Sequence, residues 1–335
     1  MRAIPLRLAP FLLLLAATLV HAAEPPDRPL ESATRKDVLN KLAERIVALY
    51  VFPEKGEAIA RSLRERMERG KYDKITRSLE LAEAVTRDLQ EVSGDKHLQL
   101  SYGQEAAPPP EDPEARKARR EAFFAELRTN NHFFEKVERL SGNVGYLDLR
   151  YFIDASLGGE TAVAAMNFLA DTDALIIDLR ENHGGEPSMV AFLASYLFSA
   201  NPVQLSGLEF REGGRSVQSW TLPYVPGRRY GEKKPVYLLT SGETFSAAEA
   251  FAYDLQSRGR AVLVGETTRG GAHFVEQIPL DDHFFVWLPL GRAVSPVTGT
   301  NWEGTGVKPD IAVPAAEAKT RAHEEALRRL RGVPK

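Results

Sequence analysis

The sequence predicts an α/β protein in which a largely parallel sheet follows a small helical region. From residue 143 onward, strand-like and helix-like segments alternate, which is typical of parallel strands joined by helices. Several of the strand-like segments, such as ALIIDLREN, are apolar at nearly every position, as in a strand covered on both faces. With 335 residues, 43% of them hydrophobic, the chain can build one large core or two modest ones.

The first 23 residues read as a signal peptide. MRAIPLR is a short basic segment, LAPFLLLLAATLV is apolar, and small residues permit cleavage after Ala22 or Ala23. The alternative is an N-terminal anchor that stays attached. The apolar run is too short to span a bilayer comfortably, and no later segment has about 18 consecutive apolar residues. We therefore expect no stable membrane insertion once the leader is removed.

Charge and composition exclude several classes of function. The formal net charge is −3, so the chain has no basic surface of the kind that binds nucleic acid. The absence of cysteine excludes disulfides, thiolate metal sites and a lipid anchor on cysteine. Export without cysteine fits a bacterial periplasm better than an animal secretory pathway, in which small domains rely on disulfides. The expected location is periplasmic or secreted, in a bacterium.

Residues 30–103 are expected to form a helical domain. Apolar residues recur at helical spacing in three successive segments, the second of which ends at Gly70. SGDKHLQLSYG then alternates like a short strand. Residues 104–140 begin with prolines and continue as a strongly charged linker helix with a solvated face. Core packing, rather than a ligand groove, is the favoured role of its aromatic residues Phe123, Phe124, Phe133 and Phe134.

Residues 141–316 are expected to form the α/β core. In order, VGYLDLRYF, ALIIDLREN, PVYLLTSG and AVLVGE read as strands, with ETAVAAMNFLADT, SMVAFLASYLFS and AAEAFAYDLQSRG as the helices between them. Hairpin turns are predicted at Gly213-Gly214 and near Asp281-Asp282. Residues 317–335 read as a closing amphipathic helix.

Ser246, in TSGETFSAAEAF, has two compatible roles. Ser246-Ala-Ala-Glu249 is a capping box, so the serine can simply begin a helix. It also lies where a buried strand ends, and open α/β sheets bind ligands at that edge. The Ala247 amide would then point, with the helix dipole, at an oxyanion formed on the serine. The motif is not G-x-S-x-G, so the α/β-hydrolase arrangement is excluded.

A nucleophilic serine needs a base and oxyanion donors. His97 and His273 are the two histidines not assigned to charged surface stretches, a hairpin turn or a glycine loop, but the residues alone do not pair either with the serine. Gly184 and Gly185, just after a buried strand, form either a plain turn or a backbone donor loop. Glu303 is either a loop glutamate or an acid that orients an imidazole.

No metal or cofactor is expected. His273-x-x-Glu276 has a spacing that metal ligands use on helices. In a strand, however, side chains three residues apart point to opposite faces.

Taken together, these segments resemble the C-terminal-processing (tail-specific) serine proteases and their relatives, the tricorn core protease and interphotoreceptor retinoid-binding protein. The resemblance covers about residues 35 to 315 and is carried by GDKHLQL, NVGYLDLRYF, ALIIDLRENHGG, TSGETFSAAEAFAYDLQSRGRAVLVGETTRGGAHF and WEGTGVKPDIAV. It implies a ClpP/crotonase-like core with a mixed sheet and a helical N-terminal domain. It also implies a serine endopeptidase that cleaves peptide or protein substrates through an acyl-enzyme on Ser246.

The resemblance favours a branch that uses histidine as the base. In the processing-protease branch a lysine lies about 25 residues after the serine, where this chain has Gly271, and a PDZ domain, missing here, is usual. In the other branch the base lies in a D-x-H segment, which matches His97, and the orienting acid matches Glu303. The implied oxyanion donors are the amides of Ala247 and of Gly184 or Gly185.

Two other functions stay open. The chain could carry a hydrophobic ligand, like a retinoid or fatty acid, on the same fold, or be an inactive scaffold that regulates another exported protein. The complete Ser/His/Glu set favours the peptidase. If the helical domain moves, His97 would reach Ser246 only in a closed form, so activity would depend on closure.

Overall fold

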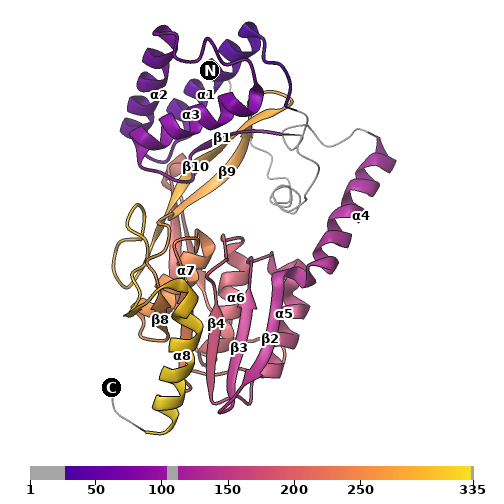
Figure 1. Ribbon diagram of the computed structural model, residues 1–335, viewed down its shortest axis with the longest axis vertical. Coiled ribbons are helices and arrows are strands. Elements are labelled where there is room, and N and C mark those ends of the chain that lie inside the picture. The colour runs from indigo at the N-terminus through magenta and orange to yellow at the C-terminus, as the bar shows by residue number, and fades with distance from the viewer. Residues whose placement is uncertain (1–26, 104–111, 333–335) are drawn as a thin grey trace.

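A computed structural model describes residues 27–103 and 112–332. The predicted leader, residues 1–23, lies outside the described residues. Figure 1 shows helices α1–α3 at one end of the molecule and a sheet flanked by helices at the other, joined by the long strands β9 and β10. In the described part of the chain, no helix combines the length and apolarity needed to cross a bilayer.

The core contains a six-stranded mixed sheet of mostly parallel strands, as predicted. Its order is β11-β8-β7-β4-β3-β2, with every neighbouring pair parallel except β2 and β3. The strands are β2 (Phe134–Leu140), β3 (Val144–Leu149), β4 (Ala174–Asp178), β7 (Val236–Thr240), β8 (Val262–Gly265) and β11 (Ile311–Ala312). Every residue of β3, β4 and β7 is buried, which explains their continuous apolar sequences.

Helices cover both faces of this sheet. Helices α5 (Ala155–Leu169), α6 (Pro187–Leu197) and α7 (Ala247–Ser257) share one apolar cluster with one face. Helix α8 (Ala315–Leu330) lies on the other face, where its three buried alanines, Ala318, Ala322 and Ala326, pack against strand side chains. The parallel strands therefore end at one edge, from which β7 leads directly toward α7.

The helical region contains α1 (Ser32–Leu49), α2 (Pro53–Glu68) and α3 (Ser78–Ser93), as predicted, followed by the short strand β1 (Gln99–Tyr102). Strand β1 pairs antiparallel with β10 (Phe284–Val294). The second sheet has the order β1-β10-β5-β6, and β9 also pairs with β10. Its other strands are β5 (Gln204–Phe210), β6 (Ser216–Trp220) and β9 (His273–Pro279).

The helical region and the β9–β10 hairpin share one hydrophobic core. Phe284, Val286 and Leu288 of β10 belong to the same buried cluster as the apolar side chains of α1–α3. The hairpin comes from the segment that the sequence assigns to the α/β core. The α/β segment of the chain therefore contributes a hairpin to the core of the helical region. In return, β1, which follows α3, is held in place by its pairing with β10.

The charged segment differs from its predicted extent. Its helix, α4 (Pro113–Thr129), ends well before residue 140, and residues 134–140 form β2, the edge strand of the six-stranded sheet. An edge strand has one partner only and tolerates charged side chains. The charged residues of FEKVERL therefore obscured the strand pattern in the sequence. Phe134 is buried in the core, Phe123 and Phe133 pack against it, and Phe124 is exposed. Both predicted hairpin turns are confirmed: Gly213-Gly214 lies between β5 and β6, and Asp281-Asp282 between β9 and β10.

Candidate active site

Ser246 occupies a strained turn between β7 and α7. Its backbone has φ +55° and ψ −119°, in a region that residues other than glycine rarely adopt. Such a conformation costs on the order of 1–3 kcal/mol and persists where the surroundings enforce it, often at functional sites. The Ser246 amide donates to Glu249 Oε2 (2.9 Å), so the glutamate half of the capping box is formed. The serine thus begins α7 and lies at the carboxyl end of β7.

Glu249 ties the start of α7 to the turn at residues 268–271. This fully buried carboxylate accepts hydrogen bonds from the Thr268 hydroxyl (2.5 Å) and from the amides of Gly270 (2.6 Å) and Gly271 (2.8 Å), besides that of Ser246. Burial raises the pKa of Glu249, and these donors act against the rise. Four donors match the acceptor capacity of an ionised carboxylate. Glu249 therefore holds two loops of the site together.

The glycine loop after β4 lies directly against the serine. A Cβ on Gly184 would stand 2.8 Å from Ser246 Cβ, and Gly184 has φ +115°, so no other residue fits there without strain. The Gly184 amide already donates to Asn182 Oδ1 (2.9 Å). Among the described residues, the amides of Gly185 and Ala247 have no hydrogen-bond acceptor. Gly185 and Ala247, rather than Gly184, are thus the amides free to bind an oxyanion.

Ser246 and His97 line the same cavity, which has a volume of about 830 Å³. The cavity lies between the glycine loop, the start of α7, strands β5 and β6, and the start of β9. Its wall is mostly apolar and includes Val190, Leu205, Leu208, Phe245 and Trp302. A volume of this size is in the range of small-molecule and peptide side-chain pockets.

His97 is buried and its ring makes no hydrogen bond. It is 8% exposed, and neither Nδ1 nor Nε2 has a partner among the described residues. The ring stacks on Phe245, with centroids 4.4 Å apart. Burial, aided by the charges of His273 and Arg269 and opposed by Asp95, lowers the pKa of His97 to about 4. The imidazole is therefore neutral at pH 7, with a nitrogen free to accept a proton in the cavity that Ser246 lines.

The ring of His97 occupies the space that a side chain at position 271 would need. A Cβ on Gly271 would lie 2.5 Å from His97 Cε1 and 2.3 Å from Phe245 Cε2. Trp302 donates to the Gly271 carbonyl (2.8 Å) and holds this backbone in place. The glycine at the position of the resembled family's lysine is thus what leaves room for the histidine.

Glu303 lies beside His273, and among the described residues no hydrogen bond or ion pair joins it to the ring of His97. Its Oε2 accepts the Ala272 amide (2.5 Å) and is 3.7 Å from His273 Nδ1, while Oε1 has no partner. Burial, together with the charge of Asp95 and against that of His273, raises the pKa of Glu303 to about 7. The structure therefore brings Ser246 and His97 to one cavity but places the predicted orienting acid on a different histidine.

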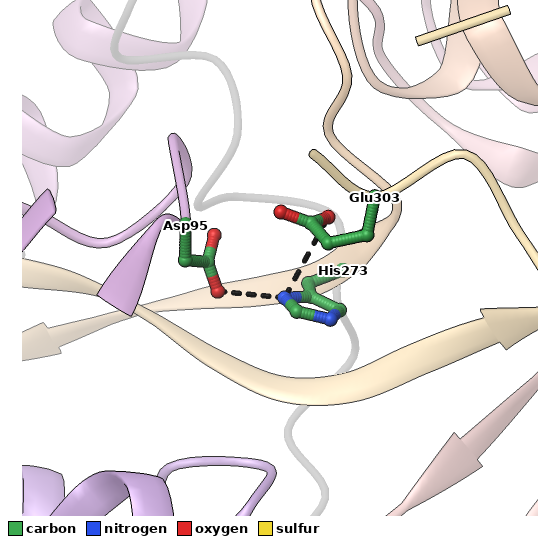
Figure 2. Close-up of side chains that lie close together, drawn as sticks. All are labelled: Asp95, His273 and Glu303. Atoms are coloured by element: carbon green, nitrogen blue, oxygen red, sulfur yellow. Dashed lines mark hydrogen bonds and ion pairs between the residues drawn. The ribbon is translucent and has the colours of Figure 1, made fainter. Parts of the chain in front are cut away.

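Glu303 approaches a buried pair, His273 and Asp95, for which the sequence predicts no role. His273 Nδ1 is 2.6 Å from Asp95 Oδ2, and both side chains are almost fully buried. Figure 2 shows both carboxylates on the Nδ1 side of the imidazole, with Nδ1 facing each of them. Asp95 also accepts the Tyr50 hydroxyl (2.9 Å) and the His97 amide (3.0 Å). The available signal was the Asp-x-His spacing, which suits a turn in which the aspartate accepts the amide two residues on.

Asp95, His273 and Glu303 each offer one atom that could ligate a metal, within 4.8 Å of one another. One atom of each residue already takes part in a hydrogen bond within the protein: Nδ1 of His273 with Asp95, Oδ2 of Asp95 with Tyr50 and Oε2 of Glu303 with the Ala272 amide. We therefore interpret the cluster as a hydrogen-bond network. His273 and Glu276 both lie in β9, three residues apart and so on opposite faces.

Two family descriptions match consecutive parts of the chain. Peptidase family S41 matches residues 143–313, more than half of the chain, and the N-terminal domain of peptidase S41 in eukaryotic IRBP matches residues 31–139. The chain therefore belongs to peptidase family S41, as its motifs indicate.

Curated relatives include the chloroplastic carboxyl-terminal-processing peptidase 1 of Arabidopsis thaliana, 29% identical over 180 residues, and the carboxy-terminal-processing protease of Bartonella bacilliformis, 28% identical over 182 residues. These matches cover 53% and 52% of this chain, and only 35% and 40% of the relatives' own length.

Solved structures share the fold at low identity. A lipoprotein from Streptococcus agalactiae has a TM-score of 0.57 at 17% identity, covering 91% of this chain and 98% of its own. The tricorn protease also has a TM-score of 0.57, at 13% identity, covering 91% of this chain and 38% of its own.

Proposed function

We propose that this member of peptidase family S41 is an exported serine endopeptidase that cleaves peptide bonds through an acyl-enzyme on Ser246. The observation that carries the proposal is the strained Ser246, which shares a cavity with a neutral, unpartnered His97. A serine hydroxyl is a weak nucleophile until a nearby base removes its proton. His97, His183 and His273 all line this cavity, and among the described residues His97 is the one whose two ring nitrogens are both buried without a hydrogen-bond partner.

In the proposed reaction, Ser246 Oγ attacks the carbonyl carbon of the peptide bond while a ring nitrogen of His97 takes its proton. The oxyanion accepts hydrogen bonds from the amides of Gly185 and Ala247, both without an acceptor among the described residues. The proton then passes from His97 to the leaving amine. Water, deprotonated by the same imidazole, releases the acid product and restores the serine.

The low pKa of His97 has a consequence for this reaction. Burial disfavours the imidazolium that forms on His97 during attack. Negative charge close to the ring must therefore stabilise it. The developing oxyanion is one, and the Asp95 carboxylate, which already acts to raise the pKa of His97, is another. Glu303 would contribute its charge through His273, because it makes no hydrogen bond to the His97 ring.

Peptide hydrolysis tests the proposal directly. The mature chain is incubated with a mixed library of unstructured peptides, and the products are identified by mass spectrometry. We expect cleavage by the wild type, and loss of cleavage by at least three orders of magnitude in Ser246→Ala and His97→Ala. Cleavage that survives Ser246→Ala would reject Ser246 as the nucleophile.

Export is part of the proposal and rests on the leader-like sequence of residues 1–23. N-terminal sequencing of the protein recovered from the bacterial periplasm should begin after Ala22 or Ala23. A chain that starts at Met1 and sediments with membranes would instead support a retained anchor.

One observation favours a second function, the carriage of a hydrophobic ligand. The cavity of about 830 Å³ has a mostly apolar wall, which suits an acyl chain as well as an apolar peptide side chain. Delipidated protein that binds a fluorescent fatty acid equally well with Ser246→Ala, and cleaves no peptide, would support the carrier.

A further inference from the structure

The nucleophile and the base of the proposed site come from different parts of the chain. Ser246 belongs to the α/β core, whereas His97 lies between α3 and β1, next to the helical region. His273 is the first residue of β9, and its side chain faces Asp95, which stands two residues before the base (Figure 2). A core residue thus contacts the turn that carries His97.

We propose that His273 is a positioning residue for the base: its Nδ1–H holds Asp95, and Asp95 holds the backbone of His97. This inference rests on the proposed function only in that His97 is the base; the hydrogen-bond chain itself does not depend on catalysis.

The hydrogen bonds define a continuous chain from core to base. His273 Nδ1 lies 2.6 Å from Asp95 Oδ2, and the other carboxylate oxygen, Oδ1, accepts the His97 amide at 3.0 Å. Tyr50 of the helical region donates to Oδ2 as a third donor (2.9 Å). Asp95 is 1% exposed, so loss of the His273 donor leaves its buried Oδ2 with Tyr50 alone and removes the link to the core.

The charge state of Asp95 fixes the direction of the bond. Burial acts to raise the pKa of Asp95, but the hydrogen bond and charge of His273, with His97, outweigh it and lower the pKa. An ionised carboxylate only accepts hydrogen bonds, so His273 must carry its proton on Nδ1. Glu303, 3.7 Å from the same nitrogen, places a second carboxylate on that side of the ring.

The position of the His97 ring depends on its backbone, because among the described residues no hydrogen bond is made to the ring itself. Both ring nitrogens lack partners among the described residues, and the ring is held by stacking on Phe245 and by the backbone that carries it. A small shift of the turn at Asp95 therefore moves the base relative to Ser246. A misplacement of about 1 Å can slow an enzyme by a hundredfold.

The test measures the second-order rate at which a fluorophosphonate probe labels Ser246 in the full chain. We expect His273→Ala to label at least tenfold more slowly than the wild type. His273→Asn should stay within threefold, because the Asn Nδ2–H₂ group can take the place of Nδ1–H. His323→Ala is the matched control, since His323 is a half-buried residue of α8 whose ring hydrogen-bonds the Ser141 carbonyl (2.9 Å), a residue outside the proposed site.

A second readout separates this inference from the proposed function. Hydrogen exchange at the His97 amide, which donates to Asp95, should speed up in His273→Ala and be preserved in His273→Asn. If the wild type is not labelled at all, the proposed function fails, and the exchange rates still decide the positioning role. Exchange and labelling unchanged in a folded His273→Ala protein, or His273→Asn as impaired as His273→Ala, would overturn it.

A measurement on the wild type covers the case in which His273→Ala fails to fold. Nitrogen-15 NMR of histidine-labelled protein should show His273 protonated at Nδ1, with a ring proton shifted downfield by its short hydrogen bond to Asp95. The same signal should be lost in Asp95→Asn. A His273 that is unprotonated at Nδ1 would contradict the proposal.

Discussion

At the scale of single residues, the site combines groups held in unfavourable states. Ser246 has a backbone conformation suited to glycine. Among the described residues, buried His97 has no hydrogen bond on its ring, and half-buried Glu303 has an Oε1 without a partner. Each state costs free energy, and each belongs to a residue that the sequence marks as a candidate for catalysis. Strain and desolvation of this kind gather at functional sites because function, rather than stability, maintains them.

The strain at Ser246 predicts an unusual order of stabilities. The free energy of unfolding should be higher for Ser246→Gly than for Ser246→Ala, by about 1 kcal/mol or more, because glycine adopts φ +55° without a Cβ penalty. In a helix interior the order would be reversed. Urea unfolding of the two variants measures the difference, and equal stabilities would show that the turn stores no strain.

Glu303 predicts a pH-dependent stability. Its pKa rises from 4.5 to about 7 on folding, so between these values the native state binds more protons than the unfolded state. Its contribution to the free energy of unfolding therefore falls as pH rises from 4.5 to 7, by at most roughly 3 kcal/mol.

Glu303→Gln removes this group and keeps an acceptor for the Ala272 amide. The variant should gain stability relative to the wild type between pH 4.5 and pH 7, as measured by urea unfolding at each pH. His97 acts in the opposite direction over pH 4 to 6.5, but it is present in both proteins and cancels in the comparison. A stability difference that does not change with pH would contradict the raised pKa.

At the scale of elements, two loops converge on the start of α7. Glu249 binds the turn at residues 268–271. The Asn182 side chain accepts a hydrogen bond from the Gly184 amide, and the Asn182 backbone carbonyl accepts one from the Phe245 amide. The strand-turn-helix at Ser246 and the glycine loop after β4 were predictable, since both follow buried strands of a parallel sheet. Their mutual contact was predictable only through the rule that such strands end at one edge.

The turn at Gly271 gives a sharp test of how the base is accommodated. Gly271→Ala should slow fluorophosphonate labelling at least tenfold, because the new Cβ would press on the His97 ring and on Phe245. Gly242→Ala is the matched control, since a Cβ there meets nothing within 4 Å and the residue has no positive φ. Equal labelling by both variants would mean that the ring of His97 has room to move without loss.

The placement of Glu303 was not predictable from local sequence. The resemblance assigned Glu303 to His97, but Glu303 approaches His273 instead. His273 begins β9, the strand that runs from the core to the helical region. Contacts of this kind depend on the strand order β1-β10-β9 and on the shared core beneath it. Neither follows from periodicity, because the hairpin's apolar residues could equally have packed on the α/β core. The edge strand β2 was not predicted for a local reason: its exposed charged residues made the segment look like part of the charged helix.

At the scale of the whole molecule, the helical region and the α/β core meet around the site. The β9–β10 hairpin packs in the helical core, and Lys96, next to the base, donates to the Arg269 carbonyl near the nucleophile. His97 and Ser246 already line one cavity. The structure is therefore a closed arrangement in which no large motion is needed to bring the base to the cavity.

This arrangement predicts the shape of the enzyme before and after reaction. Small-angle scattering curves of the free protein and of its fluorophosphonate adduct should superimpose. A contraction on labelling would show that the helical region is open in solution and that activity depends on closure.

The proposed activity depends on Ser246 being a nucleophile that His97 activates. The most direct test is fluorophosphonate labelling of the mature protein, with the adduct located by mass spectrometry, beside Ser246→Ala, His97→Ala and Glu303→Ala. We expect an adduct on Ser246 that is lost in Ser246→Ala and His97→Ala and weakened in Glu303→Ala. A well-folded wild type that is never labelled, or a His97→Ala variant labelled as fast as the wild type, would contradict it.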